Sequence, residues 1–170
     1  MNQIRIASLL AAILSLAMLN TPALGGPHKA KLQGFQEVPS VVTGGTGTFE
    51  MNIAPGDDSF DFELSYEGIE GGSVTQAHIH VGQETANGGI VVFLCTNLTP
   101  LIGVPLPQAC PLTSGTVTGT RTAADVIAQT AQGVSAGELS AVLTAIRKGK
   151  AYANVHSTVS PGGEIRGQIK

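Results

Sequence analysis

Apolar and polar residues alternate along most of the chain with a repeat of two. The clearest case is residues 60–67, where aromatic and aliphatic residues take every second position and acidic residues or serine fill the others. Successive side chains of a strand point to opposite faces, so this pattern predicts a strand with one buried and one polar face. Residues 47–53 repeat the pattern, and turn residues at 55–58 lie between the two segments. The sequence therefore predicts a β-hairpin over residues 47–67.

Six further segments have the composition of short strands. They are residues 30–36, 73–81, 89–94, 115–120, 150–156 and 163–169. About eight short strands separated by turn residues are typical of an all-β, antiparallel sandwich or barrel. One late connection has a different repeat, because apolar residues at 139, 142, 143 and 146 follow a capping-box pair, Ser135 and Glu138. That spacing predicts one short helix over about residues 136–148.

Residues 1–25 have the features of a signal peptide. Arg5 precedes an apolar run over residues 6–19, and small residues at 23 and 25 mark a plausible cleavage site. The run of about 14 residues is shorter than the ~20 needed to span a bilayer. We therefore expect residues 1–25 to be removed, leaving residues 26–170 as a single domain that is secreted or periplasmic and has no membrane span.

Composition and charge exclude several classes of function. The 170 residues are 42% hydrophobic and only 12% charged, which disfavours intrinsic disorder. A formal net charge of −3 without a large basic cluster disfavours nucleic-acid binding. Phosphate-binding loops, dinucleotide fingerprints and the nucleophile elbow of hydrolases are absent from the sequence. The pattern favours a protein that is not an enzyme.

The two cysteines of the chain, Cys95 and Cys110, both lie in the exported part. An even number of cysteines in an oxidising compartment predicts one disulfide. It closes a loop of about 16 residues and stabilises the fold by roughly 3 kcal/mol. Three prolines in residues 96–109 place this segment on the surface as a loop. Two buried free thiols are the alternative interpretation.

Three of the four histidines lie on the polar side of the predicted strands. His78 and His80 are two residues apart on one strand, and His156 lies on another. Imidazoles in this arrangement can share one metal ion at ~2.0 Å, and three of them form a site suited to copper or zinc. The same alternation places five further polar residues on that side: Gln76, Asn154, Glu164, Arg166 and Gln168. Of these, Glu164 is a candidate fourth ligand or an acceptor for an imidazole N–H.

Two other interpretations of this polar side stay open. The exposed face of an antiparallel sheet is ordinarily polar, so the same residues can form a structural hydrogen-bond network, with a local ion pair between Glu164 and Arg166. They can also form a surface for an extracellular ligand or partner. The proline-rich loop between the cysteines supports that second interpretation, because rigid scaffolds often present binding loops.

Several ordered motifs resemble the CHRD domain, which is named from chordin and also occurs singly in secreted bacterial proteins. They lie at residues 34–39, 44–48, 77–80, 154–157 and 162–168. The resemblance covers about residues 29–170 and implies an immunoglobulin-like, Greek-key β-sandwich. The cysteine pair resembles that of the bacterial single-domain members.

A more distant similarity is to Cu,Zn superoxide dismutase, which also carries His-X-His on one strand of a Greek-key sandwich. It implies copper at His78, His80 and His156, with Arg166 guiding an anion. The chain departs from that enzyme because, apart from His28 near the start of the exported part, it has no further histidine for a fourth copper ligand or a zinc bridge, and it has no Asp-rich zinc loop. We therefore expect a metal-binding or partner-binding domain rather than a dismutase.

Overall fold

Eight antiparallel strands form one sheet in the computed structural model, which describes residues 25–99 and 103–170. The strand order is β5-β4-β7-β8-β1-β2-β3-β6. The strands are β1 (His28–Gln33), β2 (Thr46–Ile53), β3 (Ser59–Glu67), β4 (Val74–Val81), β5 (Ile90–Thr96), β6 (Gly115–Thr122), β7 (Ala151–Ser157) and β8 (Ile165–Gln168). The predicted all-β antiparallel fold of eight strands is confirmed.

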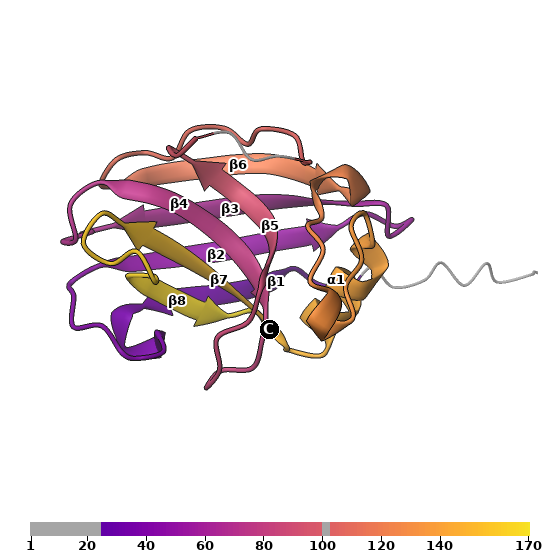
Figure 1. The fold of residues 1–170 in the computed structure, drawn as a ribbon, viewed down its shortest axis with the longest axis horizontal. Helices are drawn as coiled ribbons and strands as arrows, with labels where there is room; N and C mark the ends of the chain where they lie inside the picture. The colour runs from indigo at the N-terminus through magenta and orange to yellow at the C-terminus, as the bar shows by residue number, and fades with distance from the viewer. Residues whose placement is uncertain (1–24, 100–102) are drawn as a thin grey trace, which may run out of the picture.

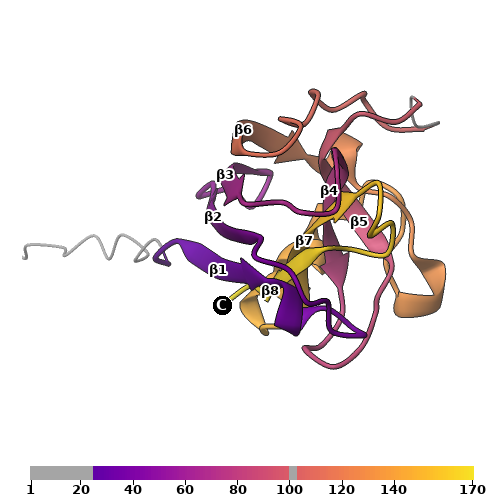
Figure 2. The same cartoon turned by 90° about the vertical axis from the view of Figure 1, so that its left-hand side faces the viewer.

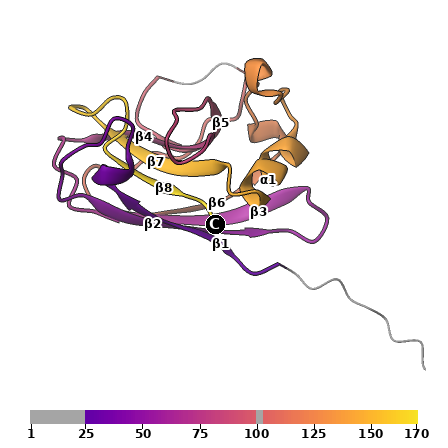
Figure 3. The same cartoon turned by 90° about the horizontal axis from the view of Figure 1, so that it is seen from below.

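The sheet folds over on itself into two layers (Figure 1). Strands β1, β2, β3 and β6 form one layer, and β4, β5, β7 and β8 form the other, as the edge-on views in Figures 2 and 3 show. The layers are joined where β1 pairs with β8, at Gln33 and Arg166. The architecture is thus one nearly closed sheet rather than two separate ones.

A side chain bridges the two edge strands. Arg121 of β6 donates from Nε to the carbonyl oxygen of Phe93 at 2.8 Å and from Nη2 to that of Leu94 at 2.8 Å. Both acceptors belong to β5. The buried guanidinium therefore links β6 to the backbone of β5, the strand at the other edge of the sheet.

The facing sides of the two layers enclose the hydrophobic core. Phe49 and Phe62 stack there with ring centroids 6.3 Å apart, and fully buried aliphatic residues fill the space between the layers. Helix α1 (Leu139–Arg147) covers one end of the core, as Figure 3 shows. It buries its apolar stripe of Leu139, Val142, Leu143 and Ile146. No helix of the described residues is both long and apolar enough to cross a bilayer.

The start of the helix and the end of the first strand each differ from the sequence prediction by three residues. The helix begins at Leu139 instead of about residue 136, because Gly137 adopts a φ of +77°. Only one part of the capping box is present, in which the Ser135 N–H donates to Glu138 Oε2 at 2.9 Å. The first strand ends at Gln33, since Gly34–Gln36 form a 3₁₀ turn. The signal peptide expected over residues 1–25 lies, apart from residue 25, outside the described residues.

Candidate metal centre

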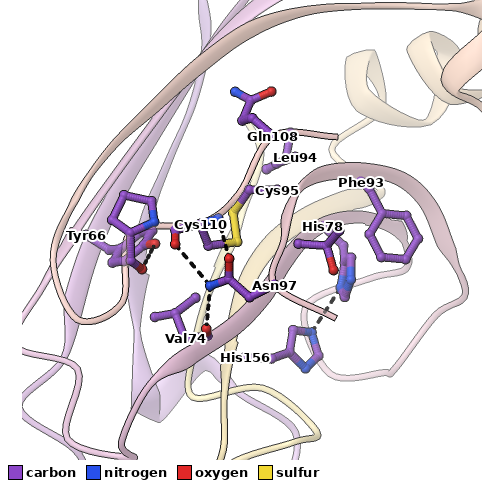
Figure 4. Close-up of a disulfide and its surroundings, with 12 residues drawn as sticks. Tyr66, Val74, His78, Phe93, Leu94, Cys95, Asn97, Gln108, Cys110 and His156 are labelled. Carbon is purple, nitrogen blue, oxygen red and sulfur yellow. Dashed lines mark hydrogen bonds between the residues drawn. A yellow bond between two sulfur atoms is a disulfide. The ribbon is translucent and has the colours of Figure 1, made fainter. Parts of the chain in front are cut away.

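The structure brings His78, His80 and His156 together. His78 and His80 come from β4 and His156 from β7, its antiparallel neighbour. One potential ligand atom from each residue lies within 4.8 Å of the others. Nδ1 of His78 is 3.1 Å from Nε2 of His156, a contact drawn in Figure 4. Strand pairing alone produces this arrangement, because neighbouring antiparallel strands present every second side chain to the same side.

All three histidines are buried, although the polar side of such a sheet is ordinarily solvated. His78 is fully buried, and His80 and His156 are each 6% exposed. Phe93 of β5 contacts His78 edge-on, with ring centroids 4.3 Å apart. The segment between β4 and β5 and the turn between β7 and β8 also cover this side, since a carbonyl oxygen of each accepts a hydrogen bond from one of the rings. The histidines therefore form a second, polar interior.

Backbone carbonyl groups fix the outer nitrogens of two rings. His80 Nδ1 donates to Gly88 O at 3.0 Å, and His156 Nδ1 donates to Pro161 O at 2.9 Å. A carbonyl oxygen only accepts hydrogen bonds, so we assign the ring proton to Nδ1 in both residues. The neutral rings then present the Nε2 lone pairs to the cluster. A backbone carbonyl bound to the outer N–H is the usual arrangement around metal-ligating histidines.

The remaining nitrogen contacts leave electron pairs unmatched. With these tautomers, His78 Nδ1 donates to His156 Nε2, and His78 Nε2 is buried without a hydrogen-bond partner. Nε2 of His80 lies 3.0 Å from Asn154 Oδ1, so two acceptor atoms face each other. A cation between these atoms satisfies the contact, as does rotation of the amide that brings its NH₂ group to the ring. This donor set fits a transition-metal ion.

Burial also keeps the rings in the form that binds metal. It lowers the pKa of His80 to about 4, with the charge of Arg166 contributing. It also lowers the pKa of His156, against the effect of the Pro161 carbonyl. Burial, and then the neighbouring histidines, hold the pKa of His78 well below its ordinary value. All three imidazoles are therefore neutral at pH 7.

Tyr152 and Arg166 extend the cluster on one side. The Tyr152 ring stacks on His80 with centroids 4.7 Å apart and planes 3° apart. The Arg166 guanidinium lies 3.4 Å from the centroid of the Tyr152 ring. Arg166 also donates to the carbonyl oxygens of Gln83 and Ala86, at 2.8 and 3.0 Å. It thereby holds the turn that supplies the Gly88 carbonyl to His80.

The other polar residues expected beside the histidines have separate roles. Both carboxylate oxygens of Glu164 accept hydrogen bonds, from the Thr43 hydroxyl and the N–H groups of residues 70 and 71. Although burial opposes it, such bonds hold the pKa of Glu164 below its ordinary value. The expected ion pair between Glu164 and Arg166 is wrong, because both side chains are engaged elsewhere. Gln168 donates to Gly82 O and Gly149 O, both at 2.9 Å. Gln76 lies opposite His156 in the strand register and is half-buried.

Sequence reasoning missed two residues near the cluster. Glu37 is 4% exposed, and its Oε1 has no hydrogen-bond partner. Burial raises the pKa of Glu37 to about 7, although Arg166 and Asn154 oppose the rise. No local pattern predicts its burial, which results from the turn after β1. Phe93 did leave a signal, because residues 90–95 are apolar without alternation, as in a strand covered on both sides.

The disulfide lies next to the histidines (Figure 4). Cys95 of β5 is bonded to Cys110 and pairs with Ala77, the residue before His78. Asn97 braces the bridge, since its side chain donates to Cys110 O at 3.0 Å and accepts from Cys110 N at 3.1 Å. The predicted disulfide is present. It anchors the strand that carries Phe93 as well as the loop that follows.

Comparisons with known proteins gave one match. The family model described as the CHRD domain matches residues 28–169. That span contains the three histidines, both cysteines and all five polar residues discussed above. No curated protein and no solved structure matches the chain.

Proposed function

The chain belongs to the CHRD domain family, and we propose that it is an exported, non-enzymatic protein that binds one transition-metal ion, copper or zinc, through His78, His80 and His156. The observation that carries this proposal is the buried cluster of three imidazoles whose potential ligand atoms lie within 4.8 Å of one another. A chance group of surface histidines has neither this burial nor this convergence of ring nitrogens.

The surroundings of the cluster support a rigid binding site. Carbonyl groups hold His80 and His156 from outside, which fixes ring orientation before an ion arrives. Little of the binding free energy is then spent on ordering the ligands. When bound, the ion supplies positive charge to the facing lone pairs, and the chain's own residues supply neutral nitrogen donors.

Export agrees with two features of the chain. Residues 1–25 have the pattern of a signal peptide. The Cys95–Cys110 disulfide persists in oxidising compartments, such as the periplasm or the extracellular space. We therefore place the protein outside the cytoplasm and propose that residues 26–170 act as a single domain there.

Titration of the tag-free exported protein with Zn(II) and with copper tests the proposal. We expect one equivalent to bind to the wild type and the affinity to fall at least about tenfold in His156→Gln, as after loss of one ligand contact. The matched control is His28→Gln, which removes the histidine outside the cluster and leaves binding unchanged.

Thermal unfolding supplies a second measurement for the same variants. A metal concentration 100 times Kd stabilises the folded state by about 2.7 kcal/mol. For a domain of this size, Tm then rises by roughly 5 to 10 °C. Absence of any metal-dependent shift in the wild type, with no saturable binding, removes the proposal. The histidines then form the structural network that is the alternative, in an extracellular protein- or matrix-binding module.

A dismutase-like copper enzyme is the less supported alternative. Turnover requires a small anion to reach the ion, whereas His78 is fully buried and its partners are each 6% exposed. Arg166, the residue that would guide an anion, is 1% exposed and donates to backbone carbonyls. A superoxide assay on copper-loaded protein distinguishes this function from binding alone.

A further inference from the structure

The potential ligand atoms of the cluster all belong to neutral groups. In the described part of the chain, the group of potential ligands consists of three histidines and no carboxylate. The neighbouring oxygen donor, Asn154 Oδ1, belongs to a neutral amide. The Glu164 carboxylate is engaged with Thr43 and the backbone of residues 70 and 71. The Glu37 carboxyl lies beside the cluster and is hydrogen-bonded to Asn154, but it is not among the potential ligands, so an ion bound here has no anionic ligand.

Building on the proposed metal-binding function, we propose that the cluster selects monovalent copper, Cu(I), over Zn(II) and Cu(II). Burial makes the charge of the ion decisive. The cost of moving an ion from water into a medium of low dielectric constant rises with the square of its charge, so a divalent ion costs about four times as much as a monovalent ion of similar size. Neutral imidazoles offset less of that cost than an anionic ligand does.

A fixed positive charge adds to this preference. Tyr152 lies on β7, between β4 with His80 and β8 with Arg166. The tyrosine ring contacts His80 by stacking and Arg166 through its guanidinium. Repulsion between Arg166 and a bound ion doubles when the charge of the ion doubles. Arg166 therefore disfavours divalent ions more than monovalent ones.

Coordination number points the same way. Imidazole nitrogen suits both copper and zinc, so the type of ligand does not discriminate between them. Zn(II) takes four ligands. Here the fourth has to be the Asn154 amide or a water molecule beside rings that are 6% exposed. Cu(I) is stable with a lower coordination number, so three neutral nitrogen donors suffice for it. Phe93, packed on His78, keeps that side of the site apolar.

Competition titrations on the tag-free exported protein test this selectivity. Cu(I) is kept monovalent with ascorbate under anaerobic conditions and competed against a chromophoric Cu(I) chelator such as bicinchoninate. Zn(II) and Cu(II) are competed against chelators of known affinity. Thiol reductants are excluded, because opening the Cys95–Cys110 disulfide adds soft ligands. We expect Cu(I) to bind about 100-fold or more tightly than Zn(II), which corresponds to about 2.7 kcal/mol.

Two substitutions change the charge beside the site. Asn154→Asp keeps the shape of the side chain and adds a carboxylate next to His80 Nε2, so we expect it to favour Zn(II) and reverse the order of affinities. Arg166→Gln removes the cation, so the logarithm of the affinity gain is expected to be twice as large for Zn(II) as for Cu(I). Arg166→Lys keeps the charge and reports the effect of losing the carbonyl contacts. Circular dichroism and metal-free unfolding confirm that each variant is folded.

The outcomes separate this inference from the proposed function. Tighter binding of Zn(II) or Cu(II) than of Cu(I) to the wild type, through the same three histidines, overturns the selectivity and leaves the metal site standing. An Asn154→Asp protein with unchanged relative affinities also overturns it. If none of the three ions binds in a manner sensitive to His156→Gln, the proposed function itself fails.

Discussion

Replacement of Glu37 by glutamine tests whether a buried carboxyl beside the cluster destabilises the fold at neutral pH. Burial raises the pKa of Glu37 from the ordinary 4.5 to about 7 in the folded protein. The folded state therefore binds this proton more tightly than the unfolded state does. Stability from this group is fully present below pH 4.5 and is lost as the pH rises to 7. Glutamine has nearly the same shape and does not titrate, so the variant does not lose this stability as the pH rises.

The interval between the pKa values of Glu37 in the unfolded and the folded state sets the size of the stability difference between the two proteins. From pH 4.5 to pH 7 it corresponds to about 3 kcal/mol in the free energy of unfolding. Near pH 4 we expect Glu37→Gln and the wild type to be about equally stable, because the carboxyl is protonated in both states. At pH 8 the variant is expected to be more stable by about 3 kcal/mol. The buried histidines titrate in both proteins, so their contribution cancels in the difference.

Urea unfolding of the metal-free proteins at intervals between pH 4 and pH 8 measures this difference. Glu63→Gln is the matched control, since Glu63 lies on the exposed side of β3. It removes a carboxylate from an exposed position and so separates the general effect of losing a negative charge from the loss of the buried one. A constant difference for Glu37→Gln over the same range, or a wild type that gains relative stability as the pH rises, refutes the reasoning.

Two further substitutions test what holds the sheet closed. Arg121→Met leaves the carbonyl groups of Phe93 and Leu94 without their donor. Since each buried unsatisfied group costs about 1–3 kcal/mol, we expect urea unfolding to show a clearly lower free energy of unfolding. Arg147→Met breaks only an exposed ion pair and is the control, so equal effects of the two changes contradict the assigned role of Arg121. Replacing both Cys95 and Cys110 by alanine is expected to lower the free energy of unfolding by about 3 kcal/mol, and unchanged stability argues against the loop-entropy account.

Alternation along the strands was sufficient to predict which side the three histidines occupy. His78, His80 and His156 lie on the side opposite Ala77, Ile79 and Val155, as a repeat of two requires. The repeat does not report what covers a side. The covering comes from the turn that carries Gly88, from Pro161 and from Phe93, which reach the rings through contacts between distant segments. The burial of the site could therefore not be predicted from local sequence patterns.

Partners of charged residues were also hard to predict from spacing. Glu164 and Arg166 are two residues apart and share a side, which made an ion pair the simplest expectation. Backbone groups compete for both side chains, because the turns at residues 70–71 and 83–86 leave N–H and carbonyl groups that no strand satisfies. Buried backbone groups must be paired, and a charged partner forms a strong hydrogen bond. Tertiary contacts thus determine the hydrogen-bond partners of both charged side chains.

The unmatched contacts around the cluster favour the proposed binding site over a structural network. A network retained for stability pairs its donors with acceptors, since a partly satisfied polar interior is less stable than an apolar one. Here His78 Nε2 is buried without a partner, and His80 Nε2 faces the oxygen of Asn154. The outer nitrogens of His80 and His156, by contrast, are fully paired with carbonyl groups. Buried oxygens of Glu37 and Gln168 also lack partners, so the proposed metal site depends on the convergence of the three rings together with the unmatched nitrogens, not on unmatched atoms alone.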